Sequence, residues 1–334
     1  MAGRRLHGSI IITYRCNARC NMCSCWEHPS KAEEEISLET IKKLPQMEFT
    51  NITGGEPFLR SDIGDIVVEL YKKTKRIVIS TNGSLSPKII NLCSRFPDIG
   101  IRISIEGLKE SNDKIRGIKD GFAKGYKTLE SLVKSGHKDV GFGMTVQDMN
   151  VHDLMNLYNM ADEMGLEFAT ALIHNSFYFR KTDNKIMDKK RTAEEFEKLI
   201  NAMLRSNSPK KWFRAYFNYG LVNYMYGKER LLPCTMGTDG FFLDPYGEIL
   251  PCNGMEYKKS MGNLNLSTWE EIWNSSKAEE VRNAVKTCTR NCWMIGSVSP
   301  AMKKNIWKPS IWIVKHKFSG CSVKKDLKAF KVGL

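Results

Sequence analysis

The sequence contains no apolar run long enough to cross a bilayer, for which a helix needs about 20 apolar residues. Its apolar clusters are short, such as residues 10–12 and residues 311–314. Arg4 and Arg5 precede the first cluster, but a run of that length cannot form the core of a signal peptide. We therefore expect a protein that is neither secreted nor membrane-spanning, with a cytoplasmic location.

Internal repeats and low-complexity segments are also missing from the 334 residues. Hydrophobic residues make up 42% of the chain and charged residues 26%, which is an ordinary globular composition. This composition excludes a disordered or collagen-like protein. The length indicates about two domains, or one large α/β domain with an appendage.

Acidic residues are scarce near the C-terminus. Residues 298–334 contain nine lysines and one aspartate, so more than half of the formal net charge of +14 lies there. The lysines alternate with aromatic residues, a composition found on solvated charged faces, at anionic membrane surfaces and in nucleic-acid-binding segments. No RNA-binding motif supports nucleic acid. The lipid alternative would place the protein peripherally at the inner face of the membrane.

The first half of the chain alternates between β-branched apolar runs and helical patterns. This alternation indicates parallel strands covered by helices, and both a doubly wound sheet and a partial barrel satisfy it. In either fold, the loops at the carboxyl ends of the strands form the site. The predicted strands are residues 8–15, 49–53, 76–80, 101–105, 140–146 and 167–173, and the predicted helices are residues 37–44, 62–72, 87–94, 121–135 and 151–164.

The ten cysteines are more typical of metal or catalytic sites than of disulfides, because the cytosol keeps thiols reduced. The first cysteine set, Cys16, Cys20 and Cys23, has the spacing C-x3-C-x2-C directly after the first predicted strand. Three thiolates from one short loop can bind three irons of a cubane cluster and leave the fourth iron open. The alternative is a zinc site with Cys25 or His28 as the fourth ligand.

The stretch CNARCNMC at residues 16–23 resembles the cluster loop of the radical S-adenosylmethionine (radical SAM) superfamily, which favours iron over zinc. Three further segments, each at the end of a predicted strand, agree with this family in order and position. They are Gly54-Gly55-Glu56-Pro57, Ser80-Thr81-Asn82-Gly83, and Ser104-Ile105-Glu106-Gly107 with Arg116 close behind.

The resemblance implies a [4Fe–4S] cluster on the first cysteine set, reduced by a protein such as flavodoxin or ferredoxin. S-adenosylmethionine on its open iron would be cleaved to a 5′-deoxyadenosyl radical that abstracts a substrate hydrogen. The motifs would bind this ligand: Gly54 and Gly55 by letting backbone approach it, and Glu56 by accepting from its ammonium group. Pro57 and Asn82 belong to the same motifs, and Ser104 and Arg116 are candidates for its carboxylate or ribose.

A second cysteine set, Cys234, Cys252, Cys288 and Cys292, lies in the second half of the chain. Four thiolates saturate an iron–sulfur cluster completely, and a four-cysteine zinc site is the alternative. The spacing from Gly247 to Cys252, the segment Gly262-Asn263-Leu264 and residues 269–273 resemble the SPASM and twitch extensions of radical SAM enzymes. Only four well-placed ligands are present, which favours one auxiliary [4Fe–4S] cluster, as in the shorter twitch form.

Three cysteines remain outside these sets. Cys93 lies on the apolar face of a predicted helix and is expected in the core. Cys25 stays undecided between a free thiol and a ligand, and Cys321 is more simply a stray thiol.

These patterns together predict a partial (β/α)6 TIM-like barrel with a small C-terminal α+β cluster domain. We expect a radical SAM core at residues 1–180, a helical connector at 181–230, a SPASM- or twitch-like domain at 231–296 and a basic aromatic tail at 297–334. The third of these should contain a hairpin at Asp244-Pro245-Tyr246-Gly247 and a helix that starts at Ser267, with Glu270 in capping-box spacing.

A fully ligated auxiliary cluster has no free iron for substrate, so its expected role is to take an electron from the substrate radical in a net oxidation. His174, Asp239 and Glu256 are candidates to take the substrate proton. Without a leader-binding segment before the first strand, we expect a small-molecule substrate such as a sugar or aminoglycoside. The alternatives are a peptide or protein maturase, of crosslinking or formylglycine type, and a non-enzymatic zinc or electron-carrier module.

Overall fold

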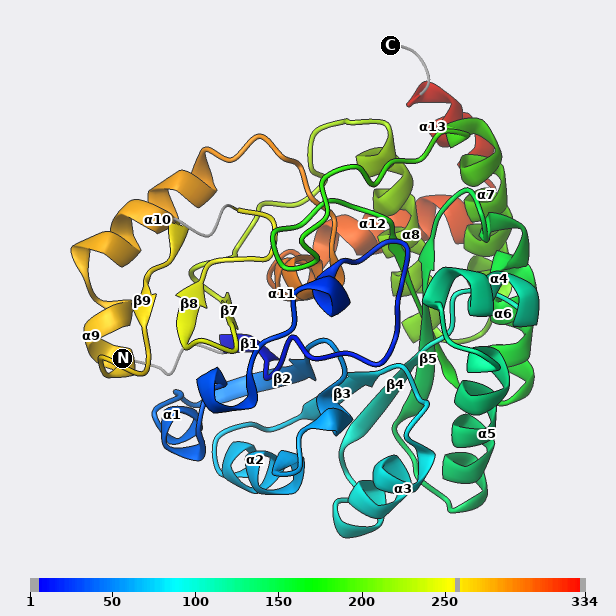
Figure 1. The fold of residues 1–334 in the computed structure, drawn as a ribbon. Coiled ribbons are helices and arrows are strands. Elements are labelled where there is room, and N and C mark those ends of the chain that lie inside the picture. The colour runs from blue at the N-terminus through cyan, green and yellow to red at the C-terminus, as the bar shows by residue number, and fades with distance from the viewer. Residues whose placement is uncertain (1–5, 256–258, 331–334) are drawn as a thin grey trace.

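Six parallel strands form the wall of an open barrel in the computed structural model, which describes residues 6–255 and 259–330 (Figure 1). Neighbouring strands pair in chain order from the first to the sixth. The predicted partial barrel is confirmed. The strands are β1 (Leu6–Ile11), β2 (Met47–Thr53), β3 (Ile77–Thr81), β4 (Gly100–Ser104), β5 (Val140–Val146) and β6 (Glu167–Leu172).

Helices cover the outer face of this wall (Figure 1). The outward side chains of the strands, such as Ile79 and Ile101, are completely buried against them. Burial of these β-branched residues between the strands and the helices contributes much of the hydrophobic stabilisation of the barrel. The helices are α1 (Leu38–Lys42), α2 (Ile63–Tyr71), α3 (Ser86–Arg95), α4 (Lys109–Arg116), α5 (Gly121–Lys134) and α6 (Leu154–Glu163).

Many inward side chains of the same strands are small or polar, although Phe49 and Val78 also face the interior. In a closed TIM barrel, bulky branched residues fill the interior in layers. Here the interior is instead a cavity of about 1400 Å³. Inward residues that border it are Ser9, Asn51, Ser80, Ser104, Gly143 and Ala169.

The second cysteine set belongs to an extension of the same sheet. Strand β7 (Gly240–Leu243) pairs in parallel with the free edge of β1, a pairing that no sequence pattern indicated. Strands β8 (Glu248–Leu250) and β9 (Gly262–Asn263) continue it antiparallel, which gives nine strands in the order β6-β5-β4-β3-β2-β1-β7-β8-β9. The predicted hairpin between β7 and β8 is confirmed, with Gly247 at φ +90°.

Side chains cap the starts of two helices, one at the predicted residue and one a residue later. Ser37 caps α1 as predicted, and its side chain accepts from the N–H of Thr40 at 3.3 Å. Helix α9 (Trp269–Trp273) begins one residue later than predicted, because Thr268 and Glu271 form the capping box instead of Ser267 and Glu270. This register buries Trp269 against Phe241, with ring centroids 4.7 Å apart. The helix that follows is α10 (Ser276–Lys286).

Helices close the side of the barrel that has no strand. The predicted connector contains α7 (Lys189–Arg205) and a second helix, α8 (Pro209–Met225), which packs on β6. Helix α11 (Ile295–Lys304) packs on β1 and β7 and lies near the centre of the ring (Figure 1).

The C-terminal segment is built into the core. Helices α12 (Trp307–Lys317) and α13 (Val323–Ala329) pack on α7 and α8. Trp312 is buried, with its ring centroid 5.0 Å from that of Tyr219 and 5.6 Å from that of Tyr216. Over residues 6–255 and 259–330, no helix combines the length and hydropathy that a membrane span requires.

Two helical glycines give a test of this packing. A methyl group at Gly220 of α8 would overlap the indole of Trp293, which is completely buried and follows Cys292 directly. We expect Gly220→Ala to destabilise the protein by about 1–3 kcal/mol, because overpacking outweighs the higher helix propensity of alanine. The thermal unfolding midpoint measures this effect.

Gly125 of α5 is the matched control. A Cβ at this position makes only ordinary contacts, the nearest at 3.4 Å from Ile103. Gly125→Ala should therefore leave the midpoint unchanged or raise it, because the higher helix propensity of alanine adds up to about 1 kcal/mol to the free energy of unfolding. Equal midpoints for the two variants would show that α8 does not pack on Trp293 as described.

Candidate active site

The first cysteine set lies in the loop that follows β1, at the carboxyl edge of the barrel. One of its thiols is buried and two are half-buried. The N–H of Arg19 donates to the carbonyl of Arg116 at 2.9 Å, and the N–H of Asn21 donates to that of Ile115 at 3.0 Å. The loop is thus fastened to the last turn of α4, where helix carbonyls lack partners within the helix.

Gly54 and Gly55 lie against the chain that leads into this loop. The N–H of Gly55 donates to the carbonyl of Thr13 at 2.8 Å, and the N–H of Glu56 donates to that of Arg15 at 2.8 Å. A Cβ on Gly54 would lie 2.6 Å from the Thr13 oxygen, and one on Gly55 would overlap the Arg15 carbonyl. This backbone contact by itself requires glycine at both positions. That Gly54 and Gly55 also let the backbone approach S-adenosylmethionine stays a prediction.

Glu56 holds two of the motifs together. Its side chain is completely buried, and its Oε1 accepts from Thr81 Oγ1 at 2.8 Å and from the N–H of Phe58 at 3.2 Å. Its Oε2 accepts from the N–H of Asn82 at 2.8 Å. Burial raises the pKa of this carboxyl, and the three donors oppose the change. These contacts give Glu56 a structural role between the loops after β2 and β3, and the expectation that it also accepts from the ligand's ammonium group stays a prediction.

The other motif residues surround the cysteine loop. Pro57 starts the turn that contains Phe58, one of the three donors to Glu56. Asn82 Nδ2 donates to Asn17 Oδ1 at 2.7 Å, within the cysteine loop itself. Ser104 ends β4 and faces the central cavity. The structure therefore brings the motif residues to one edge of the sheet, as their positions after the strands predicted.

Arg116 is the buried cation beside the first cysteine set. Its Nη1 donates to Glu106 Oε1 at 3.1 Å, while its buried Nε has no partner in the described residues. Burial raises the pKa of the Cys16 thiol to about 12, and the guanidinium acts in the opposite direction on Cys16 and Cys20. Buried thiols with a cation and an unused donor beside them fit an anionic cluster and its ligand.

Tyr178, after β6, links the same loops and was not indicated by the sequence. Its Oη donates to the carbonyl of Gly54 at 2.6 Å, and its own carbonyl accepts from Cys25 Sγ at 2.9 Å. Cys25 therefore has a hydrogen-bonding role between two loops. Cys93 is buried in the core, which confirms that prediction, and Cys321 is exposed.

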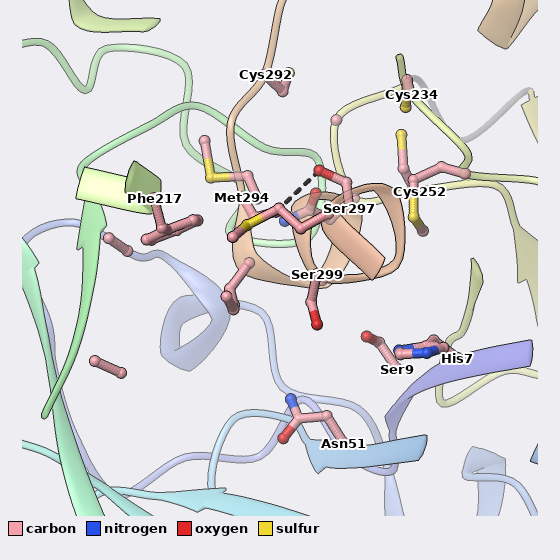
Figure 2. Close-up of a pocket in the computed structure, with 18 of the residues that line it drawn as sticks. His7, Ser9, Asn51, Phe217, Cys234, Cys252, Cys292, Met294, Ser297 and Ser299 are labelled. Atoms are coloured by element: carbon pink, nitrogen blue, oxygen red, sulfur yellow. Dashed lines mark hydrogen bonds between the residues drawn. The ribbon is translucent and has the colours of Figure 1, made fainter. Parts of the chain in front are cut away.

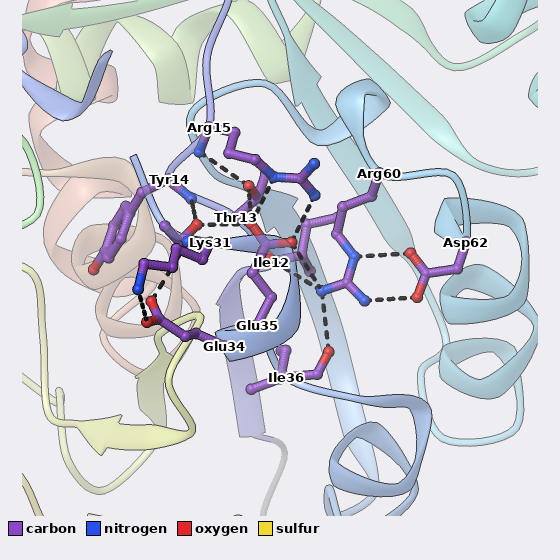
Figure 3. A network of polar contacts seen from close by, with 11 residues as sticks. Ile12, Thr13, Tyr14, Arg15, Lys31, Glu34, Glu35, Ile36, Arg60 and Asp62 are labelled. Atoms are coloured by element: carbon purple, nitrogen blue, oxygen red, sulfur yellow. Dashed lines mark hydrogen bonds and ion pairs between the residues drawn. The ribbon is translucent and has the colours of Figure 1, made fainter. Parts of the chain in front are cut away.

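A polar network holds the approach to the cysteine loop from the other side (Figure 3). The buried carboxylate of Glu35 accepts from Arg15 Nε at 3.0 Å and from Arg15 Nη2 at 2.8 Å. Arg60 Nη1 donates to the carbonyl of Ile12 at 3.0 Å, and its Nε and Nη2 form a bidentate pair with Asp62 at 2.8 and 2.6 Å. Such forked pairs fix geometry as well as charge.

The second cysteine set lines one end of the central cavity, where Cys234, Cys252 and Cys292 come from separate loops (Figure 2). Burial raises the pKa of Cys252 to about 11, and its thiol neighbours add to this change. In residues 6–255 and 259–330, no three His, Cys, Asp or Glu side chains converge on a site for one ion. Ligands of a cubane each bind a different iron, so they stand further apart than ligands of a single ion.

Arg230 is a half-buried cation next to this set, and no sequence pattern indicated it. Its guanidinium donates to the carbonyls of Cys292 and, at 3.1 Å, Ser297, and lies 5.4 Å from the centroid of the Trp293 ring. Burial lowers its pKa, while all four cysteines of the second set raise it. Each cysteine set therefore has one arginine beside it that is largely shielded from solvent.

The cavity connects the second cysteine set with the carboxyl ends of the strands. Its lining includes the four cysteines together with Thr53, Ser104 and Thr145. Figure 2 shows Ser299 of α11 pointing into the space that Ser9 and Asn51 border. The cavity therefore extends from the second cysteine set to the strand ends that carry Ser104 and Thr145.

His174, one of the three proton-acceptor candidates, lines the cavity after β6. Its Nδ1 lies 3.0 Å from the carbonyl of Leu172, and its Nε2 is buried without a partner in the described residues. Burial lowers the pKa of the imidazole, so the neutral ring is the main form at neutral pH. Because a carbonyl only accepts, Nδ1 carries the proton and Nε2 is free to accept one.

Asp239 is not part of this site. It precedes β7, which runs parallel to β1, and its carbonyl accepts from the N–H of His7 at 2.8 Å. It therefore lies at the amino edge of the sheet, opposite the cysteine loop, and pairs with Lys304 at 2.6 Å. Asp239 is close to Cys234 in sequence, but this closeness does not determine at which edge of the sheet its side chain lies. Glu256 falls outside the described residues.

Two family models match the chain. The model of the radical SAM superfamily matches residues 10–161, and that of the SPASM iron–sulfur cluster-binding domain matches residues 234–293. This chain belongs to the radical SAM superfamily. It is an enzyme of that superfamily with a SPASM domain, and it uses iron–sulfur clusters and S-adenosylmethionine. The non-enzymatic alternative is thereby excluded.

Two curated relatives match this enzyme over different lengths. The antilisterial bacteriocin subtilosin biosynthesis protein AlbA of Bacillus subtilis is 27% identical over 279 residues, 81% of this chain and 60% of that protein. Fe-coproporphyrin III synthase of Methanosarcina barkeri is 30% identical over 164 residues, 46% of this chain and 40% of that protein. The matched region is thus less than two thirds of either relative.

A solved structure supports the fold. The structure titled native anSMEcpe with bound AdoMet and Cp18Cys peptide has a TM-score of 0.63 and 17% identity, and the match covers 95% of this chain and all of that one. The shared fold includes both the barrel and the extension that carries the second cysteine set.

Arg116 allows the structural and functional parts of its role to be separated. Arg116→Met leaves Glu106 buried without its cation, which should lower the free energy of unfolding by about 3–5 kcal/mol. The double variant Arg116→Met/Glu106→Gln removes that unpaired charge and should regain much of the stability. Urea unfolding measures both values.

Formation of 5′-deoxyadenosine should stay low in both variants, because each lacks the cation beside Cys16 and Cys20. Full activity in the double variant would show that Arg116 serves only as the partner of Glu106.

Proposed function

We propose that the enzyme oxidises a side chain of a peptide or protein substrate. The observation that supports this most is the match to AlbA, named for bacteriocin biosynthesis, over 81% of the chain. The similar solved structure holds a peptide. The cavity of about 1400 Å³ is lined by all four cysteines of the second set, so it would hold a cofactor as well as substrate.

These comparisons favour the peptide alternative over the small-molecule substrate first expected. The length of the AlbA match includes most of the barrel and the extension, and the match to the tetrapyrrole enzyme covers less than half of the chain. A sugar or aminoglycoside has no support from these relatives.

We propose that the first cysteine set holds the cluster that binds S-adenosylmethionine and that the second set holds one auxiliary cluster. When bound, these groups supply the radical that removes a substrate hydrogen and the acceptor for the second electron. The chain supplies an arginine beside each set, Arg116 and Arg230, and a cavity inside the barrel in which the substrate would lie.

His174 is the proposed acceptor of the substrate proton. The residue lines the cavity, its buried Nε2 has no partner in the described residues, and its Nδ1–H is held by the Leu172 carbonyl. A net oxidation removes one hydrogen atom, one electron and one proton from the substrate, so a neutral imidazole at this point completes the reaction. Flavodoxin or ferredoxin as reductant and a cytoplasmic location complete the proposal.

The substrate class is tested by anaerobic co-production of the enzyme with each short peptide encoded beside its gene. Mass spectrometry should find one peptide lighter by two hydrogens, because the proposed reaction is a two-electron oxidation. A Cys16→Ala enzyme should yield neither this product nor 5′-deoxyadenosine.

The same assays should include amino sugars and coproporphyrin as substrates. An increase in 5′-deoxyadenosine formation with one of these, and unchanged peptides throughout, would contradict a peptide substrate.

The ligand sets are tested by iron content after anaerobic reconstitution. Two four-iron clusters give about eight irons per chain. Cys234→Ala/Cys252→Ala should lose about half of this iron and still form 5′-deoxyadenosine, because the first set is intact. Cys16→Ala/Cys20→Ala should lose the other half and all 5′-deoxyadenosine formation.

Cys93→Ala is the matched control, since this cysteine is buried in the core away from both sets. Loss of all iron in the Cys234→Ala/Cys252→Ala variant, or zinc in place of iron, would contradict two independent clusters.

A further inference from the structure

Helix α12 exposes a row of large apolar side chains. Trp307, Ile311, Val314 and Phe318 follow one another at intervals of four, three and four residues, which places them on one helical face. Their exposed fractions are 56%, 61%, 53% and 65%, and Ile306 beside them is 51% exposed. These five residues are named the α12 stripe.

The orientation of this stripe is fixed by the core. The opposite face of α12 carries Trp312, Ile313 and His316, all buried. His316 Nε2 also lies 3.0 Å from Asp326 Oδ2, which ties α12 to α13. The helix therefore cannot rotate to cover the stripe without opening the core.

The stripe is the main concentration of exposed apolar side chains in the described residues. Thirteen large apolar residues there are exposed, and five of them belong to the stripe. Single exposed apolar residues are normal, but a contiguous row of this kind marks a contact surface.

Lysines border the stripe. Lys308 and Lys315 lie along one flank of α12 and Lys317 along the other, and Lys303 and Lys304 end the preceding helix. Residues 301–318 contain no acidic side chain. The carboxylates that face this region are Asp239, paired with Lys304, and Asp326, paired with Lys315 at 3.3 Å. The surface around the stripe therefore stays positively charged.

We propose that the α12 stripe docks the enzyme onto an anionic lipid bilayer. An amphipathic helix that lies in the bilayer plane buries its aromatic and aliphatic face at the acyl boundary and places its lysines among the headgroups. A second copy of the chain is a poorer occupant, because face-to-face contact would bring the two lysine borders together. This docking does not rest on the peptide substrate.

Docking brings the bilayer next to the amino end of the barrel. Ile306, which belongs to the stripe, and Lys308, which borders it, also line the central cavity. His7, at the amino end of β1, lines the same part of the cavity, and the charge of Lys303 lowers its pKa in addition to burial.

Vesicle co-sedimentation tests the proposal with the reconstituted full-length enzyme. It should bind vesicles of phosphatidylcholine with phosphatidylglycerol and not vesicles of phosphatidylcholine alone, and salt should weaken the binding. Ile311→Ser/Val314→Ser should weaken vesicle binding by about tenfold or more, because it removes two aliphatic side chains that the bilayer would bury. Met187→Ser/Leu266→Ser, at positions 70% and 85% exposed, should bind like the unmodified enzyme.

Charge is tested separately by Lys303→Glu/Lys308→Glu, for which we expect a loss of about tenfold or more on anionic vesicles. Lys127→Glu/Lys134→Glu on the exposed face of α5 changes the net charge equally and should have no effect. Equal binding to neutral vesicles, or no vesicle binding, would overturn the proposal. So would a dimer in light scattering that the Ile311→Ser/Val314→Ser variant converts to monomer.

Discussion

The site depends on one backbone contact, in which the loop after β2 lies against the chain after β1. Two N–H groups at Gly55 and Glu56 donate to the carbonyls of Thr13 and Arg15, and there is no space for a Cβ at either glycine. The same few residues of the β1 chain are held on the other side by Glu35 and Arg60 (Figure 3). Because Cys16 follows directly, the cysteine loop starts from a fixed point. Glu56 in turn fixes the loop after β3, because its carboxylate accepts from Thr81 Oγ1 and from the N–H of Asn82.

The volume of the site follows from what the strands lack on their inner face. Ser9, Asn51, Gly143 and Ala169 leave the lumen empty, so the hydrophobic stabilisation has to come from the outer face and from the helices that close the ring. Trp293 fills the joint between α8 and the second cysteine set, where Gly220 makes room for it. The contact between Trp293 and Gly220 therefore contributes to the packing of the fold and to the position of Cys292.

Local patterns carried most of the prediction. The strands, the first cysteine loop and the motifs at strand ends were identified because each is encoded within a few neighbouring residues. The pairing of β7 with β1 was not, since contacts between residues 240 and 7 leave no periodic signal. Asp239 was misplaced for that reason, because only this pairing decides at which edge it lies. Arg230 and Tyr178 were missed because a single arginine or tyrosine in a loop resembles any surface residue until its burial is known.

The C-terminal segment shows why composition alone could not assign its role. Its aromatic residues looked alike in sequence, yet Trp312 packs between Tyr216 and Tyr219 while Trp307 and Phe318 face outward. The inward residues make the segment part of the barrel wall, and the outward ones leave apolar surface in contact with water, which a bilayer would remove. A bilayer on that side lies next to the amino end of the lumen. The first cysteine set lies at the opposite, carboxyl edge of the sheet, so a bilayer at the amino end would leave it uncovered.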